Sequence, residues 1–500
     1  MTSRPPVQEA AAAAAAAIPA LAGMPPRQRA AQLLAGADAI DERADELIEL
    51  ASAETGIEAG RLRGEVRRST VQLRLFADEV VSGEHLDVRI DEADEEFALG
   101  VRPDLRRMLV PLGPVLNFAA SNFPFAFSVA GGDTASALAA GCPVIVKAHP
   151  GHPQLSRRTA EVFSAALNAA GAPAGTFQLV EGEREGVELL QHPLIAAAAF
   201  TGSVRGGQYL AGLAAARPTP IPFYGELGSL NPVVVTPAAL DARRDEIVSG
   251  FAASVTGNAG QLCTKPGFLF VPSGSDLGPA VAAAVEAAPE HRLLYPKIAE
   301  GYADRRATIL GTDGVTVQTE GGVRFDDDQE GWARPTIVST DLDTLLRESG
   351  RLSEEAFGPL SILVEYDDGT RLAELFGTLF EGTLTAGVHV AEGADAPWVA
   401  GLVAQMTAHA GRVLFDGWPT GVAVSHAQQH GGPWPSTTTS TTTSVGTAAI
   451  QRFLRPVAFQ NAPVELLPPA LRDDNPWGVV QRRYPAGESR SWGTAAASAD

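Results

Sequence analysis

The chain has 500 residues, 45 % of them hydrophobic, which is more apolar material than one compact core needs. We therefore expect a soluble globular protein of two or three lobes. The 38 basic and 59 acidic residues give a net charge of −21, which argues against nucleic acid and anionic membranes as partners. Two cysteines in so long a chain exclude a disulfide framework, and no typical zinc-binding spacing occurs. We predict a cytoplasmic protein whose site uses no metal.

The N-terminal segment is rich in alanine, but Glu9 and Pro19 interrupt it too early for a membrane span or an export signal, so we expect a helix. From about Arg27 to Glu79, apolar residues recur at spacings of three and four, which is typical of amphipathic helices. Residues 91–111 alternate polar and apolar side chains around a turn-like Val-Arg-Pro-Asp. This pattern predicts an exposed β-hairpin that contacts another subunit.

Short apolar runs separated by helical stretches follow the hairpin. They read GPVLNFAA, CPVIVKAHP, GTFQLVEG, AAAAFTGS and PIPFYGELG. The alternation is typical of a doubly wound parallel sheet. After Asn231 the cycle starts again with NPVVVTP, DEIVSGFAASV and FLFVP, which predicts a second α/β lobe. The Ser/Thr-rich stretch at 435–449 is more typical of a surface loop or the rim of a site than of a domain boundary.

Residues 257–267 read GNAGQLCTKPG and raise the question of what Cys263 does. Free cysteine is among the most buried residue types, so a core role is as compatible with this residue as a catalytic one. The small residues before it leave room for a loop-to-helix junction, where backbone N–H groups lower the pKa of a nucleophilic thiol. Cys142, inside the apolar run AGCPVIV, is by contrast expected in the core.

Three more segments carry candidate site residues. Glu226 in YGELGSLNP is either a solvated loop charge or a partly desolvated carboxylate whose raised pKa suits a general base. Asn122 in SNFPF is either a turn residue or an amide donor to a developing oxyanion. FTGSVRGG at 200–207 has the context of a phosphate-binding turn before a helix, but it matches neither a Walker loop nor G-x-G-x-x-G.

Together these segments resemble the aldehyde dehydrogenase superfamily over residues 25–460. The motifs follow the order of that family: NFP at Asn122, VIVK at Lys147, FTGS at Ser203, ELG at Glu226, GQLC at Cys263 and EEAFGPL at 354–360. Within the superfamily, KAHPGHP, ELGSLNP and TTSVGTAAIQRFLRPVAFQ are most similar to the α-ketoglutarate semialdehyde (2,5-dioxopentanoate) dehydrogenases. The resemblance implies an aldehyde-dehydrogenase-like α/β fold with two Rossmann-like lobes and a small β oligomerisation element.

That fold implies a division of the chain into three parts. Residues 1–90 and 112–228 would form the dinucleotide-binding domain, and residues 229–445 the catalytic domain. Residues 91–111 and 446–500 would supply the bridging element and the C-terminal tail. The resemblance further implies a homodimer or a homotetramer.

The resemblance also assigns chemical roles, for oxidation of an aldehyde to a carboxylic acid through a cysteine thiohemiacetal and a thioester. Cys263 becomes the nucleophile, Asn122 with the backbone N–H of Cys263 the oxyanion hole, and Glu226 the base that activates water. Lys147 would reach the adenosine ribose. The implied pyrophosphate turn consists of Gly202, Ser203 and Gly207, and the nicotinamide end is assigned to Glu355 and Phe357.

One departure from the family pattern concerns the cofactor. Pro150 stands where NAD-preferring relatives often carry a glutamate that accepts from the ribose hydroxyls. Without that carboxylate a 2′-phosphate is not repelled. Candidate donors to such a phosphate are Lys147, His149, His152 and Arg205. The sequence therefore predicts NADP, with NAD as the alternative.

The substrate is the least constrained prediction. Phe123 and Phe127 are equally compatible with a substrate tunnel and with core packing, and a distal carboxylate has candidate partners in the Ser/Thr run, Ser425 and His426. A broad-range fatty or aromatic aldehyde dehydrogenase would use the same residues, and a CoA-acylating enzyme would pass the acyl group to a thiol. A non-catalytic dinucleotide-binding relative is the alternative of another class.

Overall fold

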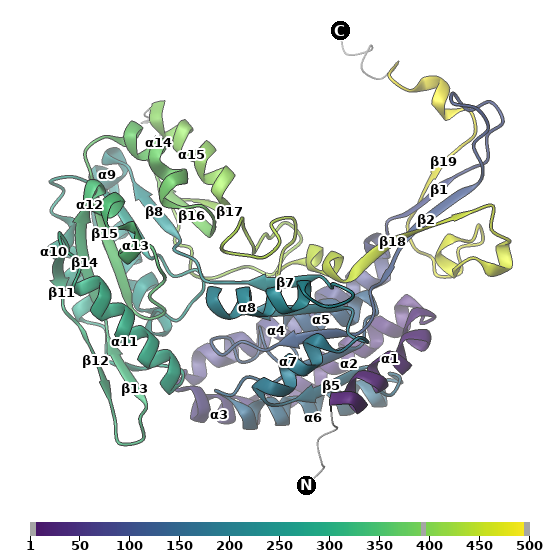
Figure 1. The fold of residues 1–500 in the computed structure, drawn as a ribbon, viewed down its shortest axis with the longest axis horizontal. Helices are drawn as coiled ribbons and strands as arrows, with labels where there is room; N and C mark the ends of the chain where they lie inside the picture. Colours follow the sequence, from purple (N-terminus) through teal and green to yellow (C-terminus); the bar gives the residue numbers. More distant parts are fainter. Residues whose placement is uncertain (1–6, 392–396, 495–500) are drawn as a thin grey trace.

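A computed structural model describes residues 7–391 and 397–494. The chain forms two α/β bodies, each built on its own sheet, and a narrow β-sheet that projects away from one of them (Figure 1). Among the described helices, none is long and apolar enough to cross a membrane.

The first body is built on a five-stranded parallel sheet. Its strands in spatial order are β5 (Phe177–Val180), β4 (Val144–Lys147), β3 (Val115–Phe118), β6 (Ala197–Thr201) and β7 (Phe223–Glu226). Both faces are covered by helices, which explains why the strands read as continuous apolar runs. Successive side chains of a strand point to opposite faces of the sheet. Val115 and Leu116 of β3 accordingly belong to different core clusters, one on each face.

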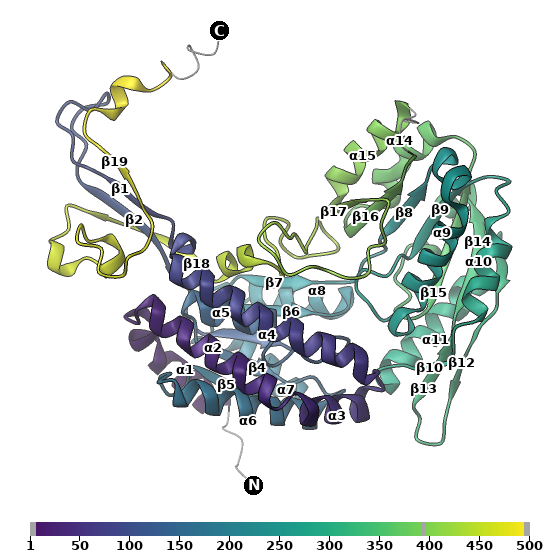
Figure 2. The same cartoon turned by 180° about the vertical axis from the view of Figure 1, so that it is seen from behind.

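The helices of this body form two layers. One face of the sheet is covered by α5 (Gly132–Ala140) and α6 (Pro153–Ala169), on which α2 (Pro26–Glu42), α3 (Ala44–Thr55) and α4 (Ala59–Ser82) pack (Figure 2). The other face is covered by α1 (Val7–Ala22), α7 (Glu183–Gln191) and α8 (Val204–Ala215). The alanine-rich N-terminal segment is the helix we expected, and it continues through Pro19.

The second body is built on a seven-stranded sheet, parallel except for its edge strand β11. The strands in spatial order are β11 (Thr316–Thr319), β14 (Thr336–Asp341), β15 (Leu360–Tyr366), β9 (Phe268–Pro272), β8 (Pro232–Val235), β16 (Thr383–His389) and β17 (Ala410–Phe415). Its helices are α9 (Pro237–Thr256), α10 (Leu277–Glu286), α11 (Pro296–Leu310), α12 (Leu342–Arg347), α13 (Ser349–Leu352), α14 (Gly369–Leu379) and α15 (Pro397–His409). A small sheet of β10 (His291–Arg292), β13 (Gly331–Arg334) and β12 (Gly322–Phe325) lies beside α11.

The projecting sheet combines segments from both ends of the chain. Its order is β18 (Leu454–Gln460), β2 (Leu105–Pro111), β1 (Val88–Asp91) and β19 (Gln481–Tyr484), and β1 pairs antiparallel with β2 (Figure 1). The expected hairpin at 91–111 therefore exists, but its first strand begins earlier, at Val88. The C-terminal strands β18 and β19 form both edges of this sheet.

The two large sheets turn opposite ends of their strands toward one region. The carboxyl ends of β3, β4, β6 and β7 carry Asn122, Lys147, Gly202 and Glu226. Asn231 directly precedes the amino end of β8, and Cys263 and Glu355 lie five residues before the first residues of β9 and β15. Because parallel strands end at a common edge, this order gathers residues that are far apart in sequence.

Candidate active site

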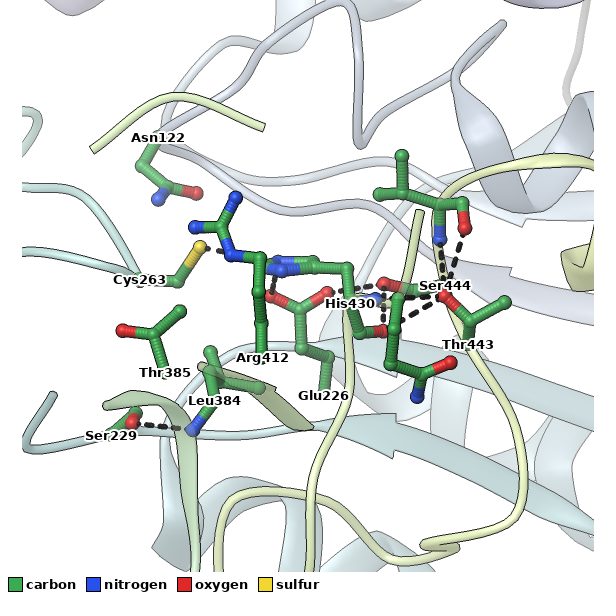
Figure 3. A network of polar contacts seen from close by, with 12 residues as sticks. Asn122, Glu226, Ser229, Cys263, Leu384, Thr385, Arg412, His430, Thr443 and Ser444 are labelled. Carbon is green, nitrogen blue, oxygen red and sulfur yellow. Dashed lines mark hydrogen bonds and ion pairs between the residues drawn. The ribbon is translucent and has the colours of Figure 1, made fainter. Parts of the chain in front are cut away.

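The three predicted catalytic residues lie together between the two bodies (Figure 3). Cys263 follows the 3-10 turn η2 (Gly257–Gly260), Glu226 ends β7, and Asn122 lies in the loop after β3. The sulfur of Cys263 is within 4.8 Å of the Glu226 carboxylate, and both carboxylate oxygens are buried. The side-chain amide of Asn122 donates to the backbone oxygen of Gln261 at 3.3 Å, two residues before the cysteine.

His430 and Ser444 complete this cluster, and the sequence analysis missed both. The Nε2 of His430 donates to Oε1 of Glu226 at 2.8 Å and lies 3.5 Å from Sγ of Cys263. The Ser444 hydroxyl donates to the other carboxylate oxygen at 2.7 Å. No motif spacing marks either residue, because His430 precedes a plain Gly-Gly pair and Ser444 belongs to the low-complexity stretch.

That Ser/Thr-rich stretch is a wall of the site. Residues 436–438 run along the free edge of β7, where Leu227 N–H donates to the Ser436 oxygen at 2.8 Å and Thr438 N–H donates to the Gly225 oxygen at 3.0 Å. Ser436, Thr437 and Ser444 are buried. The prediction of a site rim is therefore closer to the structure than the prediction of a surface loop.

The environment of Glu226 differs from the one we expected. Burial by itself raises the pKa of the carboxyl group, but the charge and N–H of His430 and the Ser444 hydroxyl act in the opposite direction and prevail. The pKa of Glu226 is therefore lowered, and the expectation of a raised value was wrong. Glu226 is an ionised acceptor held by two donors.

Cys263 also differs from the expectation. It does not start a helix, because a turn leads from it directly into β9. Burial and then the neighbouring Glu226 carboxylate raise the pKa of its thiol well above the usual value, whereas the charge of Arg68 lowers it. To act as the predicted nucleophile, Cys263 therefore needs a base, and Glu226 is the carboxylate in reach. Cys142 is completely buried in the core, as predicted.

Arg61 of α4 connects the loop that carries Asn122 with the turn that precedes Cys263. One guanidinium nitrogen donates to the backbone oxygen of Asn122 at 2.9 Å, and another donates to Oδ1 of Asn258 at 3.2 Å. Asn258 and Ala259 both have left-handed φ values, 52° and 50°, in the turn that precedes the cysteine. The side chain of Arg61 thus connects this turn to the loop of Asn122, the predicted oxyanion donor.

A buried network under the cysteine includes Ser229. Nδ2 of Asn231 donates to the backbone oxygens of Cys263 at 2.8 Å and Lys265 at 3.0 Å. The Ser229 hydroxyl donates to Oδ1 of Asn231 at 2.8 Å and accepts from Leu384 N–H at 2.9 Å. The cysteine backbone is therefore fixed to the amino ends of β8 and β16.

The residues expected to bind the pyrophosphate form a suitable turn. Gly202 and Ser203 connect β6 to α8, Gly207 lies in the first turn of that helix, and the Ser203 hydroxyl caps the helix by accepting from Gly206 N–H at 3.2 Å. A Cβ at Gly207 would lie 2.1 Å from Cδ2 of Leu227, so a larger residue is excluded by close packing. A helix N-terminus reached through glycines fits a phosphate group.

At the ribose end of the predicted cofactor site, Lys147 is the last residue of β4 and His149 follows the strand. The two candidate histidines, His149 and His152, differ from what we expected. The Nδ1 of His149 accepts from Gly151 N–H at 3.0 Å, and burial holds the pKa of His149 well below its usual value. His149 thus offers a neutral N–H donor rather than a positive charge. His152 is wholly buried and bonds to Ala120 and Ser156, so it belongs to the core.

At the nicotinamide end, Glu355 and Phe357 precede β15. Burial raises the pKa of Glu355 to about 7, although the neighbouring Lys265 acts against this shift. Lys265 is buried, donates to the backbone oxygens of Ala356 and Leu360, and has a pKa lowered to about 8, mainly by burial. A Cβ at Gly228 would lie 2.5 Å from Oε2 of Glu355, which shows how closely the two bodies meet here.

Among the described residues, Glu226, Cys263 and His430 are the one group whose donor atoms are close enough together to bind a metal ion. Hydrogen bonding between a base, a nucleophile and a donor requires the same proximity. The geometry of the cluster therefore also suits the predicted covalent chemistry.

The fold and the site define a class, namely enzymes that use a cysteine beside a dinucleotide-type sheet to attack a carbonyl carbon. The model of the Aldehyde dehydrogenase family matches residues 2–432, so the chain belongs to that family. Aldehyde dehydrogenase 21 from Physcomitrella patens, solved with the reaction product succinate, has a similar fold, with a TM-score of 0.75 at 22 % identity over 92 % of this chain and 91 % of that one.

Two relatives are similar over most of their length. Alpha-ketoglutaric semialdehyde dehydrogenase 2 of Azospirillum brasilense is 44 % identical, over 95 % of this chain and 91 % of its own. Alpha-ketoglutaric semialdehyde dehydrogenase of Acinetobacter baylyi is 42 % identical, over 88 % of this chain and 84 % of its own. The chain is an NAD(P)-dependent oxidoreductase that converts an aldehyde into a carboxylic acid.

Proposed function

We propose that the protein oxidises α-ketoglutarate semialdehyde to α-ketoglutarate, with Cys263 as nucleophile and NADP as the preferred cofactor. The observation that carries the chemistry is the convergence of Cys263, Glu226 and Asn122 at one point between the two bodies. The names of the two relatives that are more than 40 % identical support the substrate.

The reaction begins when Glu226 accepts the thiol proton of Cys263 and the sulfur bonds to the aldehyde carbon. The carbonyl electron pair becomes an oxyanion, which accepts from the amide of Asn122 and the backbone N–H of Cys263. NAD(P), when bound against the five-stranded sheet, supplies the acceptor for the hydride that leaves the same carbon as the carbonyl re-forms.

The thioester that remains on Cys263 is hydrolysed by water. Glu226, after its proton has passed to solvent, accepts a proton from this water as the oxygen attacks the acyl carbon. The carbon–sulfur bond breaks, the sulfur recovers a proton, and the carboxylic acid is released. His430 and Ser444 hold the carboxylate of Glu226 close to the reacting carbon.

The preference for NADP rests on Pro150 and on the donors at the ribose end, Lys147 and His149. Position 150 itself carries no carboxylate, and the neutral His149 offers an N–H that suits a phosphate oxygen. The measurement is the ratio of kcat/KM for the two cofactors at saturating aldehyde. A preference for NAD of tenfold or more would refute the proposal.

The test of the whole proposal is NADPH formation with purified protein and a panel of aldehydes. We expect the highest kcat/KM with α-ketoglutarate semialdehyde, and loss of turnover in Cys263→Ala. Strong activity on uncharged aldehydes alone would keep the mechanism and refute the substrate. Turnover retained by Cys263→Ala would refute the mechanism.

We also propose that the projecting sheet β18-β2-β1-β19 joins copies of the chain into a dimer or tetramer. The sheet lies outside both bodies (Figure 1). The segments that connect its strands carry exposed apolar side chains, among them Leu99 between β1 and β2 and Leu466 between β18 and β19. Exposed apolar groups on a narrow projecting element are typical of an interface.

A further inference from the structure

The guanidinium of Arg68 in α4 has no hydrogen-bond or ion-pair partner in the described part of the chain, and unlike the equally unpartnered but exposed Arg67 it is partly buried. Its Nε is buried and unpartnered. Arg61 bonds to the two loops of the site, and Arg63 and Arg74 pair with Asp45 and Asp38 on the surface. Burying part of a cation without a partner costs free energy, so such a group is a candidate for binding an anion.

The guanidinium lies in an aromatic slot next to the nucleophile. Its central carbon is 5.4 Å from the ring centre of Phe123 and 5.2 Å from that of Phe127, and the two rings are 5.6 Å apart. The Phe127 ring is also 6.1 Å from the ring of His430, which touches both Cys263 and Glu226. Arg68 therefore faces the reaction centre across apolar side chains.

The electrostatics agree with this position. Burial lowers the pKa of Arg68, and the charges of Glu65, Cys263 and Glu226 act in the opposite direction. Glu65 is committed elsewhere, since its Oε1 accepts from the N–H groups of Phe125 and Ala126. The nearby carboxylates thus act on Arg68 through space, and its donors remain available to a ligand.

A second arginine, Arg412 on β17, also lies near Cys263 (Figure 3). Two of its nitrogens donate to the backbone oxygens of Gly421 and Pro419 at 3.2 and 2.8 Å. Arg412 is therefore held by the protein through two nitrogens, although its buried Nε has no partner, whereas no nitrogen of Arg68 has a partner in the described part of the chain. Of these two cations, the one whose donors are all free is the better ligand for a carboxylate.

We propose that Arg68 binds the distal carboxylate of the substrate, while the rings of Phe123 and Phe127 pack against the methylene groups of the substrate. This inference rests on the proposed function. In α-ketoglutarate semialdehyde three carbons separate the aldehyde carbon from the carboxylate carbon. A short chain of this kind spans from the nucleophile to a cation in the adjoining slot. A planar guanidinium matches a carboxylate through two parallel hydrogen bonds.

The experiment compares Arg68→Met and Arg68→Lys with Arg67→Met, a change of the neighbouring exposed arginine on the same helix. Each variant is assayed with α-ketoglutarate semialdehyde and with pentanal, which has the same length and no charge. We expect Arg68→Met to lower kcat/KM for the semialdehyde by about 100-fold or more, mostly through KM, and to change the pentanal value by less than about threefold. The kcat/KM of Arg68→Lys for the semialdehyde should lie between those of the wild type and Arg68→Met, and Arg67→Met should match the wild type.

A binding measurement makes the result independent of turnover. α-Ketoglutarate is titrated calorimetrically into Cys263→Ala with and without Arg68→Met, and we expect binding to be lost in the double variant. Equal loss of activity with both aldehydes would overturn the proposal, because Arg68 would then act on the thiolate. Loss of selectivity in Arg412→Met with none in Arg68→Met would also overturn it.

The two proposals fail in different ways. If the wild type prefers pentanal, the proposed substrate is wrong, whatever Arg68 does. Binding of α-ketoglutarate that depends on Arg68 would still support the anion site in that case, and binding that does not depend on Arg68 would overturn it.

Discussion

His430 and Ser444 set the acidity of Glu226, because each donates a hydrogen bond to a different oxygen of the buried carboxylate. Removing either donor stabilises the protonated form, so we expect the pKa of Glu226 to rise in His430→Phe and in Ser444→Ala. Glu226 acts as a base only when ionised, and the acid limb of the kcat profile should therefore move to higher pH. The pH dependence of kcat measures this, since it reports groups in the enzyme–substrate complex.

A substitution that keeps a donor provides the control for this pH effect. His430→Gln retains a side-chain N–H and should restore much of the wild-type acid limb. If His430→Phe lowers kcat equally at every pH, the histidine only fills space, and its effect on Glu226 is refuted.

The raised pKa of the Cys263 thiol leads to a second prediction at the same scale. Burial is the larger cause and the charge of Glu226 the next, so Glu226→Gln should lower the pKa of the thiol. We expect iodoacetamide to label Cys263 at least about threefold faster in Glu226→Gln than in the wild type near neutral pH, because the thiolate is the reactive form. Steady-state turnover should nevertheless fall by about 100-fold or more, since the thioester loses its base.

The labelling rate is followed by mass spectrometry, and the fully buried Cys142 serves as an internal reference that should stay unmodified. Slower labelling in Glu226→Gln would contradict the electrostatic account. It would mean that Glu226 activates the thiol even in the absence of substrate.

The 3-10 turn η2 delivers Cys263 to the site, and its glycines are not equivalent. Gly260 has φ 65°, and a Cβ there would lie 2.3 Å from the backbone oxygen of Gly358. We expect Gly260→Ala to cost about 1–3 kcal/mol of stability and to lower kcat with every aldehyde, because the turn and the cysteine must shift together. Thermal unfolding and turnover measure the two effects.

Gly257 provides the matched control in the same turn. Its φ is −54°, and a Cβ there would meet no atom within 4 Å. Gly257→Ala should therefore keep both the melting temperature and kcat. If Gly257→Ala lost as much stability and turnover as Gly260→Ala, the turn would need flexible residues in general rather than a glycine at position 260 in particular.

Sequence alone predicted these elements to different degrees. The apolar runs gave both parallel sheets, because strands buried on two faces leave a signal that does not depend on their partners. The stretch at 435–449 gave no such signal. Its polar residues are buried only because they pair with the edge of β7 and with Glu226, and this contact joins positions more than 200 residues apart.

At the scale of the whole molecule, the active site exists because the carboxyl ends of the strands in one sheet and the amino ends of those in the other face the same region. Motif order predicted Cys263, Glu226 and Asn122 and the turn at Gly202, since each lies at the end of a strand of a recognisable sheet or in a loop next to one. Arg68 and His430 could not be predicted in this way. They come from a helix and a loop whose positions are set by packing, and an arginine on an amphipathic helix is ordinarily a surface charge.

The projecting sheet leads to the last prediction. Leu99 and Leu466 are 88 % and 71 % exposed in the single chain, and burying one leucine contributes about 1.5–3 kcal/mol. If the sheet joins subunits, Leu99→Glu and Leu466→Glu, made separately, should each weaken association by about tenfold or more. Light scattering after size-exclusion chromatography should then show a smaller mass at low protein concentration. Leu34→Glu, on the partly exposed face of α2, should keep the wild-type mass, and a monomeric wild type would refute the interface.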